Sequence, residues 1–435
     1  MYALYSLTRC LTTYLFTNSN SDRYLAGKSL LSNSFRIGTN FWDSWSIYFR
    51  RFGKVALCLL NSKPSFRKYS AADVWIYDNS PKDEKLRLQF IEMHSNDRIG
   101  GSVYRETLLY SAHFGARLLN LALLFLLFVG LIPIWIFTEN KSCTALIFNE
   151  FFEITNLVYI LKTNGAKSLY FFCIFEKDAN LTHLVLNKFG IETRKITSET
   201  PLAFWNKIIL TDTLILCFEY QTDEAAFFKD TIRYKLKTVW SPETAPSYIS
   251  KYSSSTHKTT ENKNVIGFYS TGNWIKSERG ETLESATVLD EENNLKTMLS
   301  EYLKLNSSLE LKIYLHPKEK SSLALSDTKA HYQSYFGMQN YSLANLDQPT
   351  SFLFDEINIA VSLFSTIVLE RIYFGFKTII MPLSYTNFPI QPSGLYNISV
   401  FSQADLFAKI DDNLNLTNGD FFFKYGLQNY TKHLD

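Results

Sequence analysis

Short apolar runs and amphipathic stretches alternate through the second half of the chain. Val265–Tyr269 and Leu311–Leu315 are typical of buried strands, and Asn293–Lys304 between them has the character of a helix. Ile359–Pro382 then has the pattern of a strand, a helix and a second strand, and Gln403–Asp411 predicts a terminal helix. Strands that alternate with helices at this spacing indicate βαβ units and a parallel sheet.

The first half of the chain shows the same alternation. We predict helices over Glu150–Lys162 and over Leu181–Phe189, which Gly190 ends. The strands that we predict here are short and apolar, and they cover Val55–Leu60, Val74–Tyr77, Ser168–Phe175, Ile191–Ile196 and Thr213–Tyr220. This half therefore predicts a second parallel sheet with helices.

A polar segment of low complexity, Ser253–Asn264, separates the two halves and is typical of a linker. We therefore expect an N-terminal domain over residues 1–252, a linker over 253–264 and a C-terminal domain over 265–435. The fold class that follows is α/β, with two Rossmann-like domains that face each other across a cleft.

One apolar segment in the N-terminal half is long. Leu118–Phe137 contains no charged residue, and only Asn120, Gly130 and Pro133 interrupt it. About 20 apolar residues suffice for a helix to span a bilayer, so a span, a re-entrant insertion and a buried core helix all stay open. We favour an apolar helical segment, 118–137, that associates with a membrane. Arg9 and the lack of a cleavage site argue against a signal peptide at the N-terminus.

The composition narrows the class of function. The chain of 435 residues is long enough for two domains with full cores. A formal net charge of +2 gives no indication of nucleic acid as a partner. The five cysteines are scattered and never form a CxxC pair, which argues against a disulfide scaffold or a zinc ribbon and suits a reducing compartment.

Polar residues follow two of the predicted strands in the C-terminal half. Ser270, Thr271 and Gly272 come directly after the first strand, where hydroxyls and a close backbone approach suit a phosphate or form an ordinary turn. His316 and Pro317 follow the next strand, which proline cannot continue. At the carboxyl edge of a parallel sheet, His316 is placed to bind phosphate or to orient a base.

The third strand end carries Ser365 and Thr366, at the start of the helix that contains Glu370. These hydroxyls either cap the helix or help its N-terminus to hold a phosphate. Glu370 either accepts hydrogen bonds from ribose hydroxyls or pairs on the surface with Arg371 or Lys377. Three strand-end loops of one sheet together predict a site for the phosphates of a nucleotide.

At these residues the chain resembles a family. The stretch 264–434 is similar to the donor-binding domain of GT-B-type bacterial surface-polysaccharide glycosyltransferases. His316–Pro317 and Ser365–Thr366 resemble the motifs by which sialyltransferase-like enzymes contact the nucleotide, and Thr366, Glu370 and Gly375 match a wider GT-B pattern. The resemblance implies a nucleotide-sugar donor held by the C-terminal domain, with the acceptor and the catalytic base in the N-terminal domain.

The acidic base motif of the sialyltransferases is missing from this sequence. Glu176 and Asp178 follow a predicted strand of the N-terminal domain and are our candidates for the base, with Glu219 and Asp223 in a comparable loop. Such acids also cap helices or lie in solvent. The chain has no Asp-x-Asp motif, so we predict no metal, and no cofactor beyond the nucleotide-sugar co-substrate.

These observations predict a membrane-associated, metal-independent glycosyltransferase at the cytoplasmic face of the plasma or inner membrane. Catalytic roles are predicted for Glu176, Asp178 and His316, and its acceptor is a lipid-linked or surface glycan of polysaccharide or lipopolysaccharide biosynthesis. Donor binding is assigned to Ser270, Thr271, Gly272, His316, Pro317, Ser365, Thr366 and Glu370. An alditol-phosphate transferase and a non-catalytic, membrane-anchored scaffold are the alternatives.

Overall fold

The computed structural model divides into two compact units, each described by itself. Unit 1 holds the described residues of Met1–Ser198, Trp205–Cys217 and Phe228–Pro246, and unit 2 holds those of Phe218–Phe227 and Ser247–Asp435. The structure describes residues 2–16, 21–31, 41–61, 72–78, 81, 84–108, 117–137, 141–172, 179–197, 208–240, 264–278, 284–321, 325–382 and 394–431. All but Asn264 of the predicted linker lies outside these ranges.

Unit 1 contains a parallel sheet of six strands in the order β2-β1-β3-β4-β6-β8. The strands are β1 (Val74–Asp78), β2 (Ile99–Tyr104), β3 (Ser168–Phe171), β4 (Glu192–Ile196), β6 (Thr213–Leu216) and β8 (Leu236–Val239), and β5 (Ile209–Leu210) pairs with β7 (Ile232–Arg233). Four predicted strands therefore have counterparts here, and β2 and β8 were not predicted. β3 is buried along its whole length, as expected for a central parallel strand.

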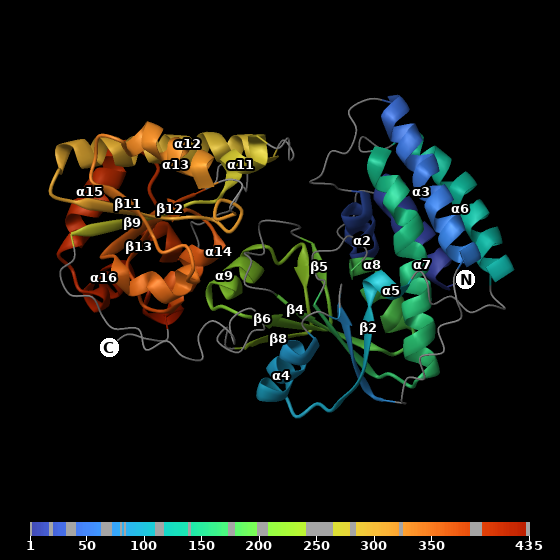
Figure 1. The fold of residues 1–435 in the computed structure, drawn as a ribbon. Coiled ribbons are helices and arrows are strands. Elements are labelled where there is room, and N and C mark those ends of the chain that lie inside the picture. The colour runs from blue at the N-terminus through green and yellow to red at the C-terminus, as the bar shows by residue number, and fades with distance from the viewer. Residues whose placement is uncertain are drawn as a thin grey trace. The chain divides into compact units, whose positions relative to one another are not determined.

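Helices of unit 1 pack on each other and on this sheet (Figure 1). One apolar core joins residues of α1, α2, α3, α6 and α7 to residues of β1, β3 and α8. The helices are α1 (Tyr2–Phe16), α2 (Asp22–Leu31), α3 (Phe41–Asn61), α4 (Glu84–His94), α5 (Arg105–Leu108), α6 (Arg117–Phe137), α7 (Lys141–Thr163) and α8 (Ala179–Lys188). The predicted helix at 150–162 is thus confirmed inside α7, and the one at 181–189 is confirmed in α8 up to Lys188.

The predicted strand Val55–Leu60 is wrong, because these residues form the last turns of α3. A short apolar run does not distinguish a strand from a buried helix segment. The helix is favoured here because Val55 and Leu59, four residues apart, are both buried in the core that includes residues of α6 and α7.

The apolar segment 118–137 is helical and coincides with α6. Its residues Leu123, Leu124, Leu127 and Leu131 are buried in the core of unit 1. Within the ranges that the structure describes, no helix combines the length and the apolar character that crossing a membrane requires.

Unit 2 contains a parallel sheet of five strands in the order β11-β10-β9-β12-β13. Counted along the chain, this is the order 3-2-1-4-5 of Rossmann-like nucleotide-binding sheets. The strands are β9 (Val265–Tyr269), β10 (Glu310–Tyr314), β11 (Tyr341–Leu343), β12 (Ile359–Leu363) and β13 (Thr378–Met381). The predicted α/β class and the parallel sheet of the C-terminal half are confirmed.

Helices cover both faces of this sheet, with α12 and α13 on one face and α14 on the other (Figure 1). The helices are α9 (Tyr220–Phe227), α11 (Asn273–Glu278), α12 (Glu284–Leu305), α13 (Leu325–Phe336), α14 (Thr366–Tyr373), α15 (Gln403–Leu414) and α16 (Asn418–Tyr425), with 3-10 turns at Thr350–Glu356, Gly394–Ile398 and Gln428–Tyr430. α14 stops before Gly375, whose φ of 77° is open to glycine but strained for other residues. Gly375 therefore suits the turn that follows the helix.

Candidate functional site

The carboxyl ends of β10, β9 and β12 lie side by side in the sheet of unit 2. The chain leaves β9 toward β10 on one side and returns to β12 on the other, so the strand order reverses between β9 and β12. Ligands of open parallel sheets bind outside the strand ends at such a reversal. Ser270–Gly272 follows β9 and Ser365–Thr366 follows β12, so both predicted motifs lie at this point.

The hydroxyls after β9 donate to two buried carboxylates. The Ser270 Oγ lies 3.1 Å from Glu292 Oε1 and 2.9 Å from Glu319 Oε1, and the Thr271 hydroxyl donates to Glu292 Oε2. Glu292 comes from α12, while Glu319 follows β10. These contacts connect the β9 loop to α12 and to the β10 loop. The hydroxyls that we considered as phosphate ligands from the sequence therefore have a structural role here.

Glu319 is the centre of this cluster. Its Oε1 also accepts from Trp274 Nε1 at 2.5 Å and from the Tyr332 hydroxyl at 3.0 Å, while its Oε2 accepts from the His316 backbone N–H at 2.6 Å. Burial, followed by the charge of Glu292, raises the pKa of Glu319. The Ser270 hydroxyl has a single hydrogen, so it donates to one of the two carboxyl groups at a time.

The β9 and β10 loops meet at Gly272 and His316. Gly272 has a φ of 65°, and a Cβ at this position would come within 2.8 Å of His316 Cγ. His316 is half-buried and its Nδ1 accepts from the Lys318 backbone N–H at 3.2 Å, while Pro317 is exposed. A glycine is therefore required for the imidazole to lie against the β9 loop.

The start of α14 differs from an ordinary capped helix. Ser365 has the extended backbone of an N-cap residue (φ −156°, ψ 164°), yet its side chain makes no capping hydrogen bond. Ser402, at the start of α15, has nearly the same backbone (φ −148°, ψ 164°) and accepts from the Asp405 N–H at 3.2 Å. Ser365 and Thr366 are half-buried. The α14 terminus thus retains backbone N–H groups that its serine does not satisfy.

Surface pairing of Glu370 with Arg371 or Lys377 is wrong. Arg371 is fully buried and donates to the carbonyl oxygens of Phe354, Ile357 and Lys377. Lys377 is also buried, and its ammonium donates to the carbonyl oxygens of Asn413, Leu414 and Leu416. Both cations hold loops of unit 2 together, because buried charges need such partners. Glu370 is itself buried on α14.

A second buried layer supports the cluster from α12 and α13. His331 stacks on Trp274, with ring centroids 4.4 Å apart, and its Nε2 lies 2.6 Å from Lys296 Nζ. Burial lowers the pKa of Lys296 to about 8 and, with the charge of Lys296, lowers that of His331 to about 3. His331 is therefore neutral at physiological pH and accepts from the lysine.

The structure describes only part of the candidates for a base. Glu176 and Asp178 lie outside the described residues. Asp223 accepts a hydrogen bond from the Tyr430 hydroxyl, and both residues belong to unit 2. Asp78, which sequence reasoning missed, ends β1 beside β3 in unit 1, where it forms an ion pair with Arg87 of α4. It is a buried carboxylate at the carboxyl edge of that sheet.

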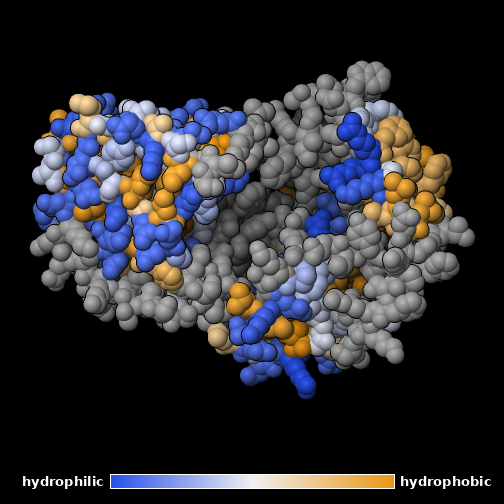
Figure 2. Space-filling model, viewed as in Figure 1, coloured by the Kyte–Doolittle hydropathy of each residue, from blue (hydrophilic) through white to orange (hydrophobic). Residues whose placement is uncertain are grey.

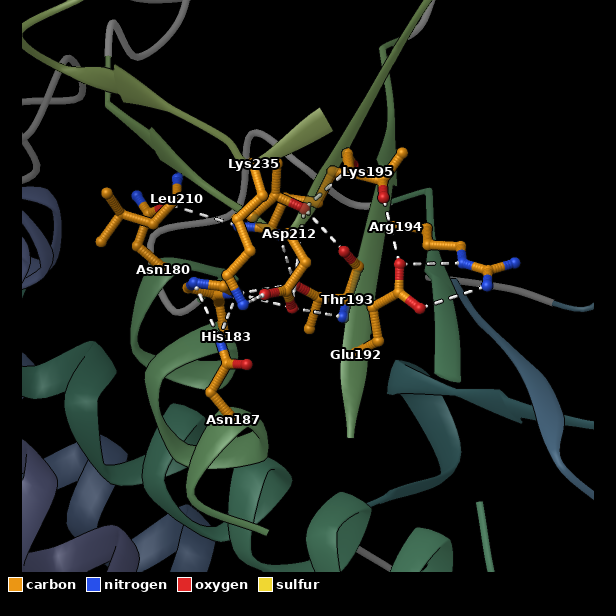
Figure 3. A network of polar contacts seen from close by, with 12 residues as sticks. Asn180, His183, Asn187, Glu192, Thr193, Arg194, Lys195, Leu210, Asp212 and Lys235 are labelled. Carbon is orange, nitrogen blue, oxygen red and sulfur yellow. Dashed lines mark hydrogen bonds and ion pairs between the residues drawn. The ribbon is translucent and has the colours of Figure 1, made fainter. Parts of the chain in front are cut away.

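Unit 1 has a polar network of its own, but at the amino edge of its sheet (Figure 3). Thr193, at the start of β4, donates its backbone N–H to Asp212 Oδ2 at 2.8 Å, and its hydroxyl lies 2.6 Å from His183 Nδ1. Lys235 pairs with Asp212 Oδ1 at 2.7 Å, and Asn187 contacts the His183 ring. Burial, then the charge of Lys195, lowers the pKa of His183 to about 3.

Sequence reasoning also missed Glu292, Glu319 and Lys296. Glu319 stands three residues after His316, where a charged side chain after a strand is usually taken as solvated. The role of Glu319 becomes visible only in the tertiary structure, which brings the hydrogen-bond donors of Trp274 and Tyr332 to its carboxylate. Over the part of the chain that the structure describes, no three His, Cys, Asp or Glu side chains gather as metal ligands do.

No protein-family model and no curated protein match the chain. Among solved structures, it is similar to the S. aureus MnaA–UDP co-structure, with 10% identity, a TM-score of 0.42 and coverage of 83% of this chain and 91% of that one. Acinetobacter baumannii MurG is 11% identical, with a TM-score of 0.38 and coverage of 78% of this chain and 84% of that one. The wall teichoic acid polymerase TagF is 12% identical, with a TM-score of 0.36 and coverage of 89% of this chain and 92% of that one. TM-scores this low assign neither a family nor an activity.

Proposed function

We propose that the chain is a glycosyltransferase of GT-B type that transfers a sugar from a nucleotide-sugar donor. Two observations of strand order in unit 2 carry the proposal: Ser270–Gly272 and Ser365–Thr366 lie at the reversal between β9 and β12, and His316–Pro317 lies at the end of the neighbouring strand β10. The acceptor is a lipid-linked or surface glycan of bacterial polysaccharide or lipopolysaccharide synthesis, used at the cytoplasmic face of the membrane.

The donor's phosphates belong at the start of α14. The N-terminal N–H groups of a helix and its dipole favour an anion, and the Ser365 side chain does not use those groups for a cap. The Ser365 and Thr366 hydroxyls and the His316 imidazole are further donors at neighbouring strand ends. Glu370, buried in the second turn of α14, remains the proposed partner of the ribose hydroxyls.

The Ser270 turn contributes in a different way. Its hydroxyls donate to Glu292 and Glu319, so it shapes the edge of the site and holds Gly272 against His316. Two carboxylates beside a phosphate site would repel the ligand. The raised pKa of Glu319 and the buried ammonium of Lys296 both reduce the negative charge there.

Sugar transfer needs two events at such a site. The bond between the anomeric carbon and the phosphate oxygen breaks, and the leaving phosphate carries away the electron pair while the N–H groups of α14 and His316 stabilise its charge. The acceptor hydroxyl attacks the anomeric carbon and gives its proton to a base, for which Glu176 and Asp178 remain our candidates. No Asp-x-Asp motif is present to hold a metal.

The proposal is tested by thermal shift of the full chain with CMP, UDP, dTDP and GDP. A nucleotide that binds only the folded state raises Tm by mass action. We expect one nucleotide to stabilise the wild type and to lose that effect in His316→Ala and in Ser365→Ala.

Ser402→Ala is the matched control for Ser365→Ala, since both serines precede helices of unit 2. It loses a capping hydrogen bond and should cost about 1 kcal/mol of stability without changing the nucleotide response. Ser365→Ala loses no cap and should leave the basal Tm nearly unchanged. No response to any nucleotide from protein that melts cooperatively would contradict the proposal and favour the scaffold.

Turnover then separates the two transferases. With the nucleotide identified, release of free nucleotide from its sugar conjugate in the presence of a glycan acceptor supports glycosyl transfer. Release from its alditol conjugate alone would identify an alditol-phosphate transferase and contradict our proposal.

A further inference from the structure

One face of α6 is apolar and exposed. Phe125 and Leu126 are each 60% exposed, and Val129 and Ile136 are exposed along the same side of the helix. The opposite side, with Leu124 and the other leucines named above, is buried in the core of unit 1. The helix is therefore apolar on the side that faces solvent as well as on the side that packs, which soluble surface helices are not.

The exposed side of α3 continues this surface. Phe49, Leu57 and Leu60 are exposed on α3, and Phe49 meets Phe128 of α6 with ring centroids 5.3 Å apart. Figure 2 shows hydrophobic side chains gathered over these two helices, at the right of the view. We call the exposed set the apolar face: Phe49, Leu57, Leu60, Phe125, Leu126, Val129 and Ile136.

Basic residues line the apolar face on α3. Arg50 and Lys54 are exposed and lie one turn apart, and Leu57 follows on the same side of the helix. Arg51 is half-buried beside them, and none of the three forms an ion pair with another described residue. α3 contains a single acid, Asp43, and α6 contains none. The surface therefore joins apolar side chains to positive charge.

We propose that the apolar face docks on a bilayer that carries anionic lipids, with α3 and α6 in the interfacial plane. Contiguous exposed apolar surface marks an interaction site, and helices that bind membrane interfaces combine such a surface with Lys and Arg. The charge decides between partners, because phosphate headgroups meet the long basic side chains at the boundary of the acyl region. This inference does not depend on the proposed transfer reaction.

The test is flotation of the full chain with vesicles of phosphatidylcholine alone and of phosphatidylcholine mixed with phosphatidylglycerol. We expect tighter binding to the anionic vesicles, weakened by added salt. Arg50→Gln/Lys54→Gln should reduce binding to anionic vesicles about tenfold or more. Phe125→Gln/Leu126→Gln should reduce binding to both kinds of vesicle, also by about tenfold or more.

Two control pairs make the same chemical changes on unit 2. Lys304→Gln/Lys329→Gln removes two exposed charges, and Leu305→Gln/Phe423→Gln removes two apolar side chains that are 75% and 78% exposed. Both controls should bind like the wild type. An unchanged Tm shows that each variant folds.

Three results would overturn the proposal. The first is no binding to either vesicle by folded protein, and the second is an equal loss in the control pairs. The third is self-association in sedimentation velocity that only the apolar variants abolish, which would make the apolar face an interface between two copies. Equal binding to neutral and anionic vesicles would remove the role given to Arg50 and Lys54.

Discussion

Each unit buries a network of histidine, carboxylate and hydroxyl groups, but at opposite edges of a parallel sheet. The network of unit 1, His183, Thr193 and Asp212, lies where β4 and β6 begin. The network of unit 2, Ser270, Glu292 and Glu319, lies where β9 and β10 end. His183 in the first network and His331, which packs beside the second, both have a pKa that burial lowers to about 3, so composition alone does not tell the two regions apart.

The difference lies in what each network holds. In unit 1, the Asp212 carboxylate accepts the Thr193 N–H and pairs with Lys235, so its contacts join elements of the fold. In unit 2, Glu319 holds the backbone of His316, and Ser270 holds the loop of Gly272, so the same kind of contact shapes the edge where ligands bind. The position in the sheet therefore indicates function where residue types do not.

Glu319→Ala should have the largest effect. It leaves the Trp274 N–H, the Tyr332 hydroxyl and the His316 N–H without their buried acceptor, and each such loss costs about 1–3 kcal/mol. We expect a loss of more than about 3 kcal/mol in denaturant unfolding. Glu319→Gln retains an acceptor for Trp274 and Tyr332 but turns an amide toward His316, so it should lose less stability and still lose the nucleotide response.

Asp212→Ala is the counterpart in unit 1. It removes the acceptor of the buried Thr193 N–H and the partner of Lys235, whose exposed pairing adds little. We expect a cost of about 2 kcal/mol in stability. The nucleotide-induced shift in Tm should stay that of the wild type, and a loss of that shift would contradict the distinction between the two edges.

Gly272→Ala should cost about 1–2 kcal/mol, because its φ of 65° is strained for alanine. The new Cβ would also press on the His316 ring, so we expect a weaker nucleotide response than the stability loss explains. Gly190→Ala is the control: its φ is 71°, and no atom lies within 4 Å of the added Cβ. Equal nucleotide responses in both variants would contradict the proposed role of His316 in donor binding.

The smallest effect is the pH dependence that the two networks share. The pKa of His183 and of His331 falls from 6.5 to about 3 in the folded state, so the unfolded chain takes up protons first as pH falls. Their contribution to stability is complete above pH 6.5 and is lost as pH falls toward 3. As pH falls from about 7.5 to about 6, each histidine should lower the free energy of unfolding by about 0.8 kcal/mol. His183→Asn should flatten this slope, as measured by urea unfolding across the range.

Much of the fold could be predicted from local patterns. The strand Val265–Tyr269 was predicted to the residue, and Ile191–Ile196 differs from β4 by one residue. Both are apolar runs bounded by polar turns, and such runs form buried strands wherever helices cover both faces of a sheet. The predicted helix end at Gly190 is confirmed by the end of α8 at Lys188, and Gly190 has a φ of 71°, which glycine tolerates.

The failures arose where two structures suit one pattern. Val55–Leu60 is apolar enough for a strand, and only its packing against α6 and α7 makes it a helix. Arg371 and Lys377 look like surface charges in the sequence, but both are buried and donate hydrogen bonds to carbonyl oxygens of loops distant in sequence. The sequence does not show such acceptors, because they come from residues far away along the chain.

The sequence by itself determined the α/β class, the alternation of strands and helices, and the placement of His316 and Ser365 at strand ends, because these depend on neighbours within a few residues. Only the tertiary structure decided the strand order that brings β9 beside β12, the burial of Glu319, and the exposed apolar side of α6. Those depend on which faces pack against each other, and burial free energy, summed over the whole core, selects that packing.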